Sequence, residues 1–194
     1  LRLHGGLVVN PVIRLFVALP LPTDQCQRLR ILCGGVRDAR WTEEANLHMT
    51  LQFIGEVREP EVDEIAAALS SVEAESFDLT LSGVGHFGSH RKIRSLWAGI
   101  ISSPALYRLQ KRIENVLIRK GIAPDTRKFS PHITLARLKY ARPLHVRDWL
   151  EGNSYFRGPS FKVDSFTLFH SYRAHTGAIY SPLENFLLRH EATV

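Results

Sequence analysis

The chain has 194 residues, of which 44% are hydrophobic and 23% are charged, and its formal net charge is +6. This composition is ordinary for a soluble globular protein with its own hydrophobic core, so disulfide staples are not needed. No apolar run approaches the roughly 20 residues of a membrane-spanning helix, which argues against a membrane protein, and the modest positive charge favours a polyanionic partner such as nucleic acid.

The first 12 residues are expected to lie outside the folded domain. They lack the long apolar core and the small-residue cleavage pattern of a signal peptide, and the only methionine is Met49. We interpret residues 1–12 as a processed start or a cloning remnant, either disordered or non-native, and we expect a cytoplasmic protein. Cys26 and Cys33 fit neither a redox nor a zinc spacing and are typical of reduced thiols on a helix face.

The first half of the chain is predicted to run strand, helix, strand, helix, strand. Residues 14–22 form an apolar run that ends in prolines and predicts a buried strand, after which Thr23 can cap a helix. A polar loop leads to a strand around residues 46–55. Pro60 then opens an amphipathic helix, and the alternation in residues 77–87 predicts another strand.

The second half repeats this order. Residues 96–100 predict an apolar strand, Ser103 a helix cap, residues 128–137 a further strand, Pro143 a helix start and residues 161–171 the last strong strand. The tail after this strand can add one more.

The two halves also agree in spacing. His48 and His132 are 84 residues apart, and the first residues of the strands that follow them are separated by the same number. We therefore predict two copies of one unit, about residues 14–88 and 95–171, in a single bilobal domain over residues 13–194. Chance similarity between common elements is the alternative.

Each half carries one His-x-Thr-Leu segment, His48–Leu51 in "NLHMTLQFIG" and His132–Leu135 in "KFSPHITLAR". Side chains alternate between the two faces of a strand, so the histidine and threonine of each segment point the same way and the residues between them point into a core. If a pseudo-twofold axis relates the copies, both His-Thr pairs face one groove.

Two imidazoles on opposite sides of one atom can act as a general acid and a general base near neutral pH. The threonine hydroxyls can donate to non-bridging oxygens. This set of groups suits an in-line displacement at phosphorus that needs no metal.

Other interpretations of the histidines remain open. Either histidine alone could be an ordinary core or surface residue. A zinc site needs three or four ligands, and no Cys or acidic residue stands at ligand spacing beside either segment; a Ser/His/Asp triad needs a G-x-S-x-G turn, which is absent. We interpret the remaining histidines as structural or surface residues: His4, His86, His90, His145, His170, His175 and His190.

Several segments together resemble the 2H phosphoesterase superfamily, in its RNA 2′,3′-cyclic phosphodiesterase family, also called the 2′-5′ RNA ligase family. They are "RLFVALPLP", "TEEANLHMTLQFIGEV", "LWAGI", "FSPHITLARLK" and "FTLFHSYRAHTGAIYSPLENFLL". The resemblance covers about residues 13–188. It implies an α+β fold in which two pseudo-symmetric lobes of antiparallel strands line a central groove, with helices on the outside.

The resemblance also implies an activity and roles for named residues. The reaction would be metal-independent hydrolysis of a 2′,3′-cyclic phosphate at the end of RNA to a 2′-phosphomonoester. His48 would donate a proton to the leaving 3′ oxygen, His132 would accept a proton from water, and Thr50 and Thr134 would hold phosphate oxygens. We expect no cofactor and a monomer whose partner is RNA with a 2′,3′-cyclic phosphate end.

Arg137 matches a phosphate-binding position of the family, but strict alternation puts it on the face opposite His132 unless a bulge intervenes. An exposed, salt-bridged arginine is the alternative. Phe53 stands at the same offset in the first copy, where a core role is favoured over stacking on a base.

Two basic groups can follow RNA phosphates or simply form a solvated surface: Arg127, Lys128, Arg137 and Lys139 around the second segment, and Arg91, Lys92 and Arg94 between the halves. Three other uses of the fold also stay open: 2′-5′ RNA ligation, hydrolysis of a small cyclic nucleotide, and RNA binding without catalysis.

Overall fold

The computed structural model describes residues 11–89, 92–139, 143–174 and 177–190. Its strands are β1 (Val12–Pro20), β2 (Ala39–Trp41), β3 (His48–Arg58), β4 (Phe77–Ser89), β5 (Lys92–Ile100), β6 (His132–Leu138), β7 (Arg157–Val163), β8 (Ser165–Ala174) and β9 (Gly177–Leu187). Its helices are α1 (Thr23–Ile31), α2 (Glu59–Ser70), α3 (Pro104–Arg119) and α4 (Pro143–Gly152), with a short 3₁₀ helix η1 (Glu44–Asn46). Residues 1–10 of the expected extension lie outside the described residues, whereas Val12 already belongs to β1.

The strands form an antiparallel sheet in the order β7-β4-β5-β6-β3-β1-β8-β9, and β2 pairs with β6 beside β3. The expected α+β architecture of antiparallel strands and outer helices is confirmed. We call β3, β1, β8 and β9 the first lobe, and β7, β4, β5, β6 and β2 the second lobe. The lobes meet where β3 lies beside β6, through the single registered pair Met49 and Ile133.

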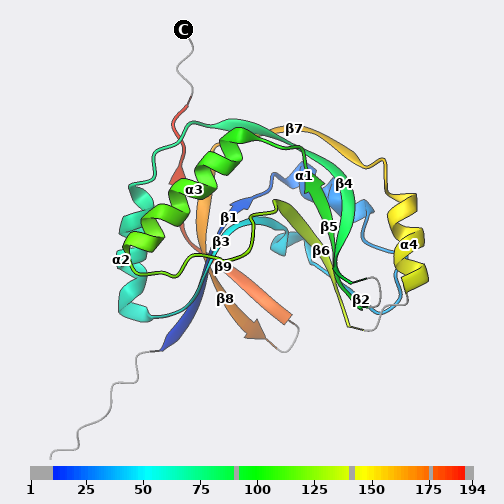
Figure 1. Ribbon diagram of the computed structural model, residues 1–194, viewed down its shortest axis with the longest axis horizontal. Coiled ribbons are helices and arrows are strands. Elements are labelled where there is room, and N and C mark those ends of the chain that lie inside the picture. The colour runs from blue at the N-terminus through cyan, green and yellow to red at the C-terminus, as the bar shows by residue number, and fades with distance from the viewer. Residues whose placement is uncertain (1–10, 90–91, 140–142, 175–176, 191–194) are drawn as a thin grey trace, which may run out of the picture.

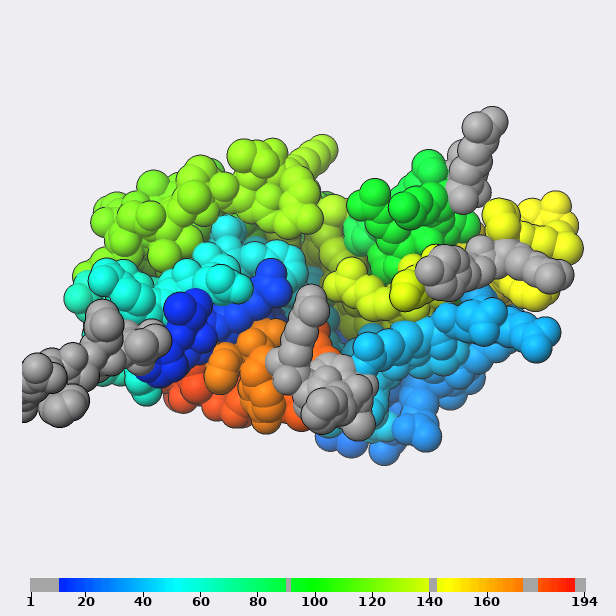
Figure 2. Space-filling view, turned by 90° about the horizontal axis from the view of Figure 1, so that it is seen from below, coloured from blue at the N-terminus to red at the C-terminus, as the bar shows by residue number. Residues whose placement is uncertain are grey.

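The two lobes form an arch (Figure 1). Figure 2 views this arch from below, with β1 and β8 in blue and orange on one side, β4 and β5 in green on the other, and a recessed surface between them. Outward from the junction, the order is β6, β5, β4 in the second lobe and β3, β1, β8 in the first. In each lobe the histidine strand is followed by the first strand of its own half of the chain and then by a strand from the other half. This arrangement is what a pseudo-twofold axis at the junction requires.

The helices cover the outside of the arch. Two of them, α1 and α3, lie on the lobe opposite their own half of the chain. Helix α3, from the second half, contacts β3 and α2 of the first lobe. At the other end, Trp149 on α4 donates its indole N–H to the carbonyl of Leu32, just after α1, at 2.9 Å. The halves of the chain are therefore not the lobes, since each lobe is completed by a helix from the other half (Figure 1).

The helix starts follow the expected chemistry only in part. On α3 the Ser103 hydroxyl accepts from the Leu106 N–H, as the sequence predicts, and Leu106, Leu109 and Ile113 are fully buried. On α1, however, Pro22 occupies the N-cap position and no side chain caps the helix. The prediction of a Thr23 cap is therefore wrong, because Thr23 is already the first helical residue.

The predicted strand at residues 161–171 is in fact two strands. Strand β7 ends at Val163 and β8 begins at Ser165. β7 pairs with β4 in the second lobe, whereas β8 pairs with β1 in the first. The chain crosses from one lobe to the other at Asp164, a change that an apolar pattern alone does not reveal. The tail forms β9, which pairs with β8 as the outermost strand of the first lobe.

Candidate active site

Both His-x-Thr segments lie at the junction of the lobes. Met49 and Ile133 are paired across β3 and β6, and both are fully buried. Continuing this antiparallel register by one residue in each direction places His48 opposite Thr134 and Thr50 opposite His132. All four side chains share the face opposite the buried pair and are half-buried. The two histidines occupy diagonal positions, with Cβ atoms typically ~7–8 Å apart in such a pair.

Each imidazole is held by the same backbone contact. His48 Nδ1 lies 2.8 Å from the carbonyl oxygen of Asn46, and His132 Nδ1 lies 2.7 Å from that of Ser130. A carbonyl oxygen can only accept, so in both neutral rings Nδ1 carries the proton and Nε2 carries a lone pair. Both rings therefore present a proton-accepting nitrogen that is not used in these contacts.

Aromatic rings from three strands surround His48. Its ring centroid is 5.0 Å from Phe16 on β1, 6.2 Å from Phe169 on β8 and 5.0 Å from Tyr180 on β9. Beside His48, a pocket of about 700 Å³ continues between η1 and the ends of β1, β8 and β9. It is lined mainly by apolar atoms, and its polar lining residues are Thr23, Glu44, Asn46, His48, Thr167 and Asn185.

A smaller aromatic set flanks His132. The Phe87 ring meets it edge-on at 4.7 Å, and Trp97 lies at 6.4 Å. The Trp97 ring lies across Gly85 on the neighbouring strand, where an added Cβ would come within 2.2 Å of it. Gly85 therefore leaves the space that Trp97 needs beside His132.

These surroundings disfavour the charged form of both histidines. The pKa of His48 is lowered from 6.5 to about 4, mainly by burial and also by the charges of His132 and Arg137, against the opposing effect of the Asn46 hydrogen bond. Burial also lowers the pKa of His132, again opposed by its carbonyl contact and assisted by Arg137. The charge of Arg137 thus acts on both imidazoles.

A β-bulge brings Arg137 to the histidine face. Thr134 pairs with Trp97 and Ala136 pairs with Leu96, so Leu135 is an extra residue on β6. Leu135 and Ala136 are both fully buried, and the alternation resumes with Arg137 exposed. The sequence required a bulge for Arg137 to reach the site. This bulge is present, and Arg137 consequently lies on the same face as His132.

Thr42 binds both carbonyls at this bulge. Its N–H donates to the carbonyl of Leu135 at 2.8 Å, and its hydroxyl donates to that of Thr134 at 3.0 Å. Because Thr42 follows directly after β2, this short strand helps to fix the shape of β6 at the bulge.

The first segment has a matching bulge. Thr50 pairs with Ala18 and Gln52 with Val17, which leaves Leu51 as the extra residue of β3. Phe53 consequently lies on the histidine face, 53% exposed, with its ring 6.3 Å from that of Phe16. The interpretation of Phe53 as a core residue is wrong, because it assumed uninterrupted alternation.

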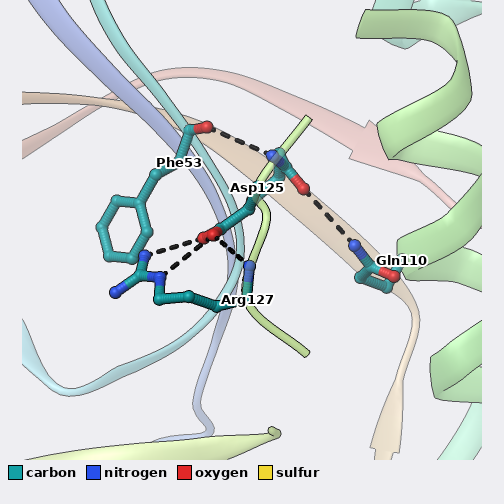
Figure 3. Close-up of polar contacts among 5 residues, drawn as sticks. Phe53, Gln110, Asp125 and Arg127 are labelled. Carbon is teal, nitrogen blue, oxygen red and sulfur yellow. Dashed lines mark hydrogen bonds and ion pairs between the residues drawn. The ribbon is translucent and has the colours of Figure 1, made fainter. Parts of the chain in front are cut away.

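Next to Phe53 lie two separate groups of polar contacts, one between β3 and α3 and one within the loop before β6 (Figure 3). The buried Gln52 amide donates to the carbonyl of Phe53, and Gln110 on α3 donates to Gln52. Arg127 makes three hydrogen bonds to the Asp125 carboxylate, from its backbone N–H and from two guanidinium nitrogens. The predicted basic residue Arg127 is therefore neutralised locally, whereas Lys128, Lys92 and Arg94 are exposed; Arg91 lies outside the described residues.

Within the described ranges, no three His, Cys, Asp or Glu side chains are grouped so that they could hold a metal ion. None of the described helices is long and apolar enough to cross a membrane.

Sequence reasoning missed the aromatic residues around the histidines, namely Phe16, Phe87, Trp97, Phe169 and Tyr180. All of them except Tyr180 stand in predicted strands and carried some signal. Their approach to the histidines depends on the pairing of β1, β4, β5, β8 and β9 with their neighbours, which no local pattern specifies.

Comparison with known proteins agrees with this geometry. The family model described as LigT like Phosphoesterase matches residues 19–97 and 101–180. An RNA 2′,3′-cyclic phosphodiesterase of Aeropyrum pernix is 38% identical over 73% of this chain and 81% of the relative. An RNA 2′,3′-cyclic phosphodiesterase of Thermotoga maritima is 34% identical over 75% of this chain and 77% of the relative. The crystal structure of Escherichia coli LigT with 3′-AMP superposes with a TM-score of 0.75 at 27% identity, over 92% of this chain and 99% of LigT. This chain belongs to the LigT-like phosphoesterases of the 2H phosphoesterase superfamily, which confirms the family and the phosphodiesterase class expected from the sequence.

Proposed function

We propose that this enzyme hydrolyses the 2′,3′-cyclic phosphate at the end of RNA to a 2′-phosphomonoester, with His48 and His132 as the acid–base pair. The observation that carries the proposal is the shared face of His48, Thr50, His132 and Thr134, on which each imidazole has its Nδ1 fixed by a carbonyl and its Nε2 available. Relatives named RNA 2′,3′-cyclic phosphodiesterases supply the substrate class.

In this mechanism His132 Nε2 takes a proton from water as the water oxygen bonds to phosphorus. The bond from phosphorus to the 3′ oxygen breaks on the opposite side, and His48 gives its proton to that oxygen. Thr50 and Thr134 donate to the non-bridging oxygens, and the Arg137 guanidinium stabilises their charge. The phosphate stays on the 2′ oxygen, and the two histidines end with their protonation states exchanged.

The pocket beside His48 supports its assignment as the acid. The leaving 3′ oxygen belongs to the terminal nucleoside, which must therefore lie on the side of the general acid. The 700 Å³ pocket with Phe169 and Tyr180 on its walls is large enough for a nucleoside and offers aromatic faces to it.

The test uses a short RNA ending in a 2′,3′-cyclic phosphate, with EDTA present. We expect His48→Ala and His132→Ala each to lower kcat at least about a hundredfold, because each removes one proton-transfer group. Phosphorus NMR of the wild-type product should show a 2′-phosphomonoester.

His145→Ala, on α4 outside the arch, is the matched control and should retain activity. Thermal unfolding of each variant checks that it is folded. Near-normal turnover by either active-site variant, or a 3′-phosphate product, would reject the mechanism.

A further inference from the structure

A second arginine stands directly beside Arg137. In the β2–β6 register Arg40 is paired with Arg137, and on the other side of β6 Arg137 is paired with Ser95. Residues directly opposite in an antiparallel pair project from the same face, with Cβ atoms ~4.5–5.5 Å apart. Since the bulge turns Arg137 toward the histidine face, Arg40 projects from that face as well.

The neighbours of Arg40 agree with this orientation. Ala39 and Trp41 pack against the hydrophobic core, and the Trp41 ring lies 6.1 Å from that of Trp149 on the outer helix α4. Arg40 itself is exposed. Because side chains alternate along β2, Ala39 and Trp41 face the core beneath the outer helices, and Arg40 faces the groove.

This pairing concentrates positive charge at one end of the site. Like charges directly opposite in a sheet destabilise it, and none of the ion pairs formed by the described residues includes Arg137. The field of Arg137 already reaches both histidines, whose pKa values it lowers. Guanidinium groups match phosphate oxygens in geometry, so this end of the groove suits a phosphate anion.

The place of β2 identifies which phosphate would come here. β2 and β3 lie on the same side of β6, joined through η1, so Arg40 lies beyond the His48 end of β3. All three residues of η1, Glu44, Ala45 and Asn46, also form a wall of the pocket beside His48, and the Glu44 carboxylate is paired with Arg30 at 3.8 Å. A nucleoside in that pocket would direct its 5′ side along η1 toward Arg40, whereas its cyclic phosphate lies between the histidines.

We propose that Arg40 binds the phosphodiester that precedes the terminal nucleotide of the RNA, while Arg137 beside it acts on the cyclic phosphate. This inference rests on the proposed function, whose substrate it narrows from any 2′,3′-cyclic nucleotide to one with at least one nucleotide before it. Arg40 is thus a specificity residue for chain length, and it does not touch the reacting phosphorus.

The experiment compares three substrates with the same terminal nucleoside: a nucleoside 2′,3′-cyclic phosphate, a dinucleotide with the same end, and that dinucleotide with an uncharged methylphosphonate linkage. The measured quantity is the preference, the ratio of kcat/KM for the dinucleotide to kcat/KM for the mononucleotide. We expect the wild type to prefer the charged dinucleotide over both others, and Arg40→Gln to lower that preference about tenfold.

The salt dependence gives an independent readout. For the charged dinucleotide, the slope of log(kcat/KM) against log salt should fall by about 0.7 in Arg40→Gln, the value for one phosphate contact on a single strand. Arg119→Gln, at the exposed end of α3, removes the same charge from a distant surface and should change neither the preference nor the slope. Thermal unfolding of Arg40→Gln and Arg119→Gln checks that both variants are folded.

Each outcome decides the inference. An unchanged preference in Arg40→Gln, or an equal preference of the wild type for charged and methylphosphonate dinucleotides, overturns it and leaves the hydrolase proposal standing. If the wild type turns over no cyclic phosphate, the hydrolase proposal fails. The same comparison is then made by calorimetric binding of a dinucleotide and a mononucleotide ending in 2′-phosphate, and equal affinities of wild type and Arg40→Gln for the dinucleotide overturn the inference on its own.

Discussion

At the scale of single residues, the state of His48 is the most informative feature of the site. Its ring is packed among Phe16, Phe169 and Tyr180, and its pKa is lowered to about 4. A general acid must carry its proton when the reaction begins. In the free protein at neutral pH the lone-pair form dominates, so the acid form has to be restored by the substrate. A phosphate monoanion beside the ring does this, because a negative charge favours the imidazolium and raises its pKa.

The pH dependence of the reaction tests this reasoning. Both histidine pKa values are lowered in the free protein, so the optimum of kcat/KM, which reports free enzyme, should lie below pH 6.5. The optimum of kcat, which reports the complex, should lie higher by about one pH unit or more, because the bound anion raises both pKa values. The two profiles are measured on one cyclic-phosphate RNA between pH 4 and 9.

Coincident optima above pH 7 would contradict this prediction. The profile of the His145→Ala control should match that of the wild type. Because the two imidazoles interact, the limbs of each bell belong to the pair and are not assigned to single residues.

At the scale of elements, the bulges of β3 and β6 decide which residues face the groove. Strand alternation was enough to predict that His48 and Thr50, and likewise His132 and Thr134, share a face. Alternation failed a few residues further along each strand, at Phe53 and Arg137, because a bulge is set by the register with neighbouring strands. The sequence contains the residues, but the partners that define each bulge are far away along the chain, on β1 for β3 and on β5 for β6.

Thr42 is predicted to act through the β6 bulge. Thr42→Val keeps the shape of the side chain and the backbone N–H bond, but it loses the hydroxyl bond to the carbonyl of Thr134. We expect a loss of about 1 kcal/mol in the free energy of unfolding and a fall in kcat/KM of roughly three- to tenfold, as Arg137 loses its fixed position. Unfolding by urea and steady-state kinetics measure the two effects.

Thr42→Ser retains the hydroxyl and should recover most of both. A double-mutant cycle with Arg137→Gln separates positioning from a general structural effect. If Thr42→Val still lowers kcat/KM by its full factor in the Arg137→Gln background, the bulge does not act through Arg137.

At the scale of the whole molecule, the predicted elements were largely correct and their pairing was not accessible. The order of strands and helices and the extra tail strand could be derived from apolar patterns. The crossing at Asp164 and the exchange of α1 and α3 between lobes could not, because both follow from contacts between segments that lie far apart in the chain.

The stability of the whole molecule should depend on pH through His48. Its folded pKa of about 4 lies below the unfolded value of 6.5, so between these limits the unfolded chain binds more protons. The contribution is fully present above pH 6.5 and is lost as the pH falls toward 4, on the order of 2–3 kcal/mol. The free energy of unfolding of His48→Asn, which has no ionisable group here, should therefore improve relative to the wild type as the pH falls through this range.

Urea titrations at several pH values give both curves. Acidic residues with lowered pKa values, such as Asp125 and Glu61, contribute equally to both proteins and cancel in the difference. Parallel curves for wild type and His48→Asn would show that burial of the ring does not carry this effect.

The exchange of helices between the lobes has a consequence for how such a molecule can be assembled. Helix α3 of the second half covers the histidine strand β3 of the first half, β8 of the second half pairs with β1, and β4 of the first half pairs with β5. Neither half alone would therefore bury its own apolar surface. Two identical half-length chains, in contrast, could associate as a closed C2 dimer in which each covers the other. Such a dimer would build the same groove from a single motif used twice. Joining them end to end frees each copy to diverge, which is how Phe53 and Arg137 can stand at equivalent places with different chemistry.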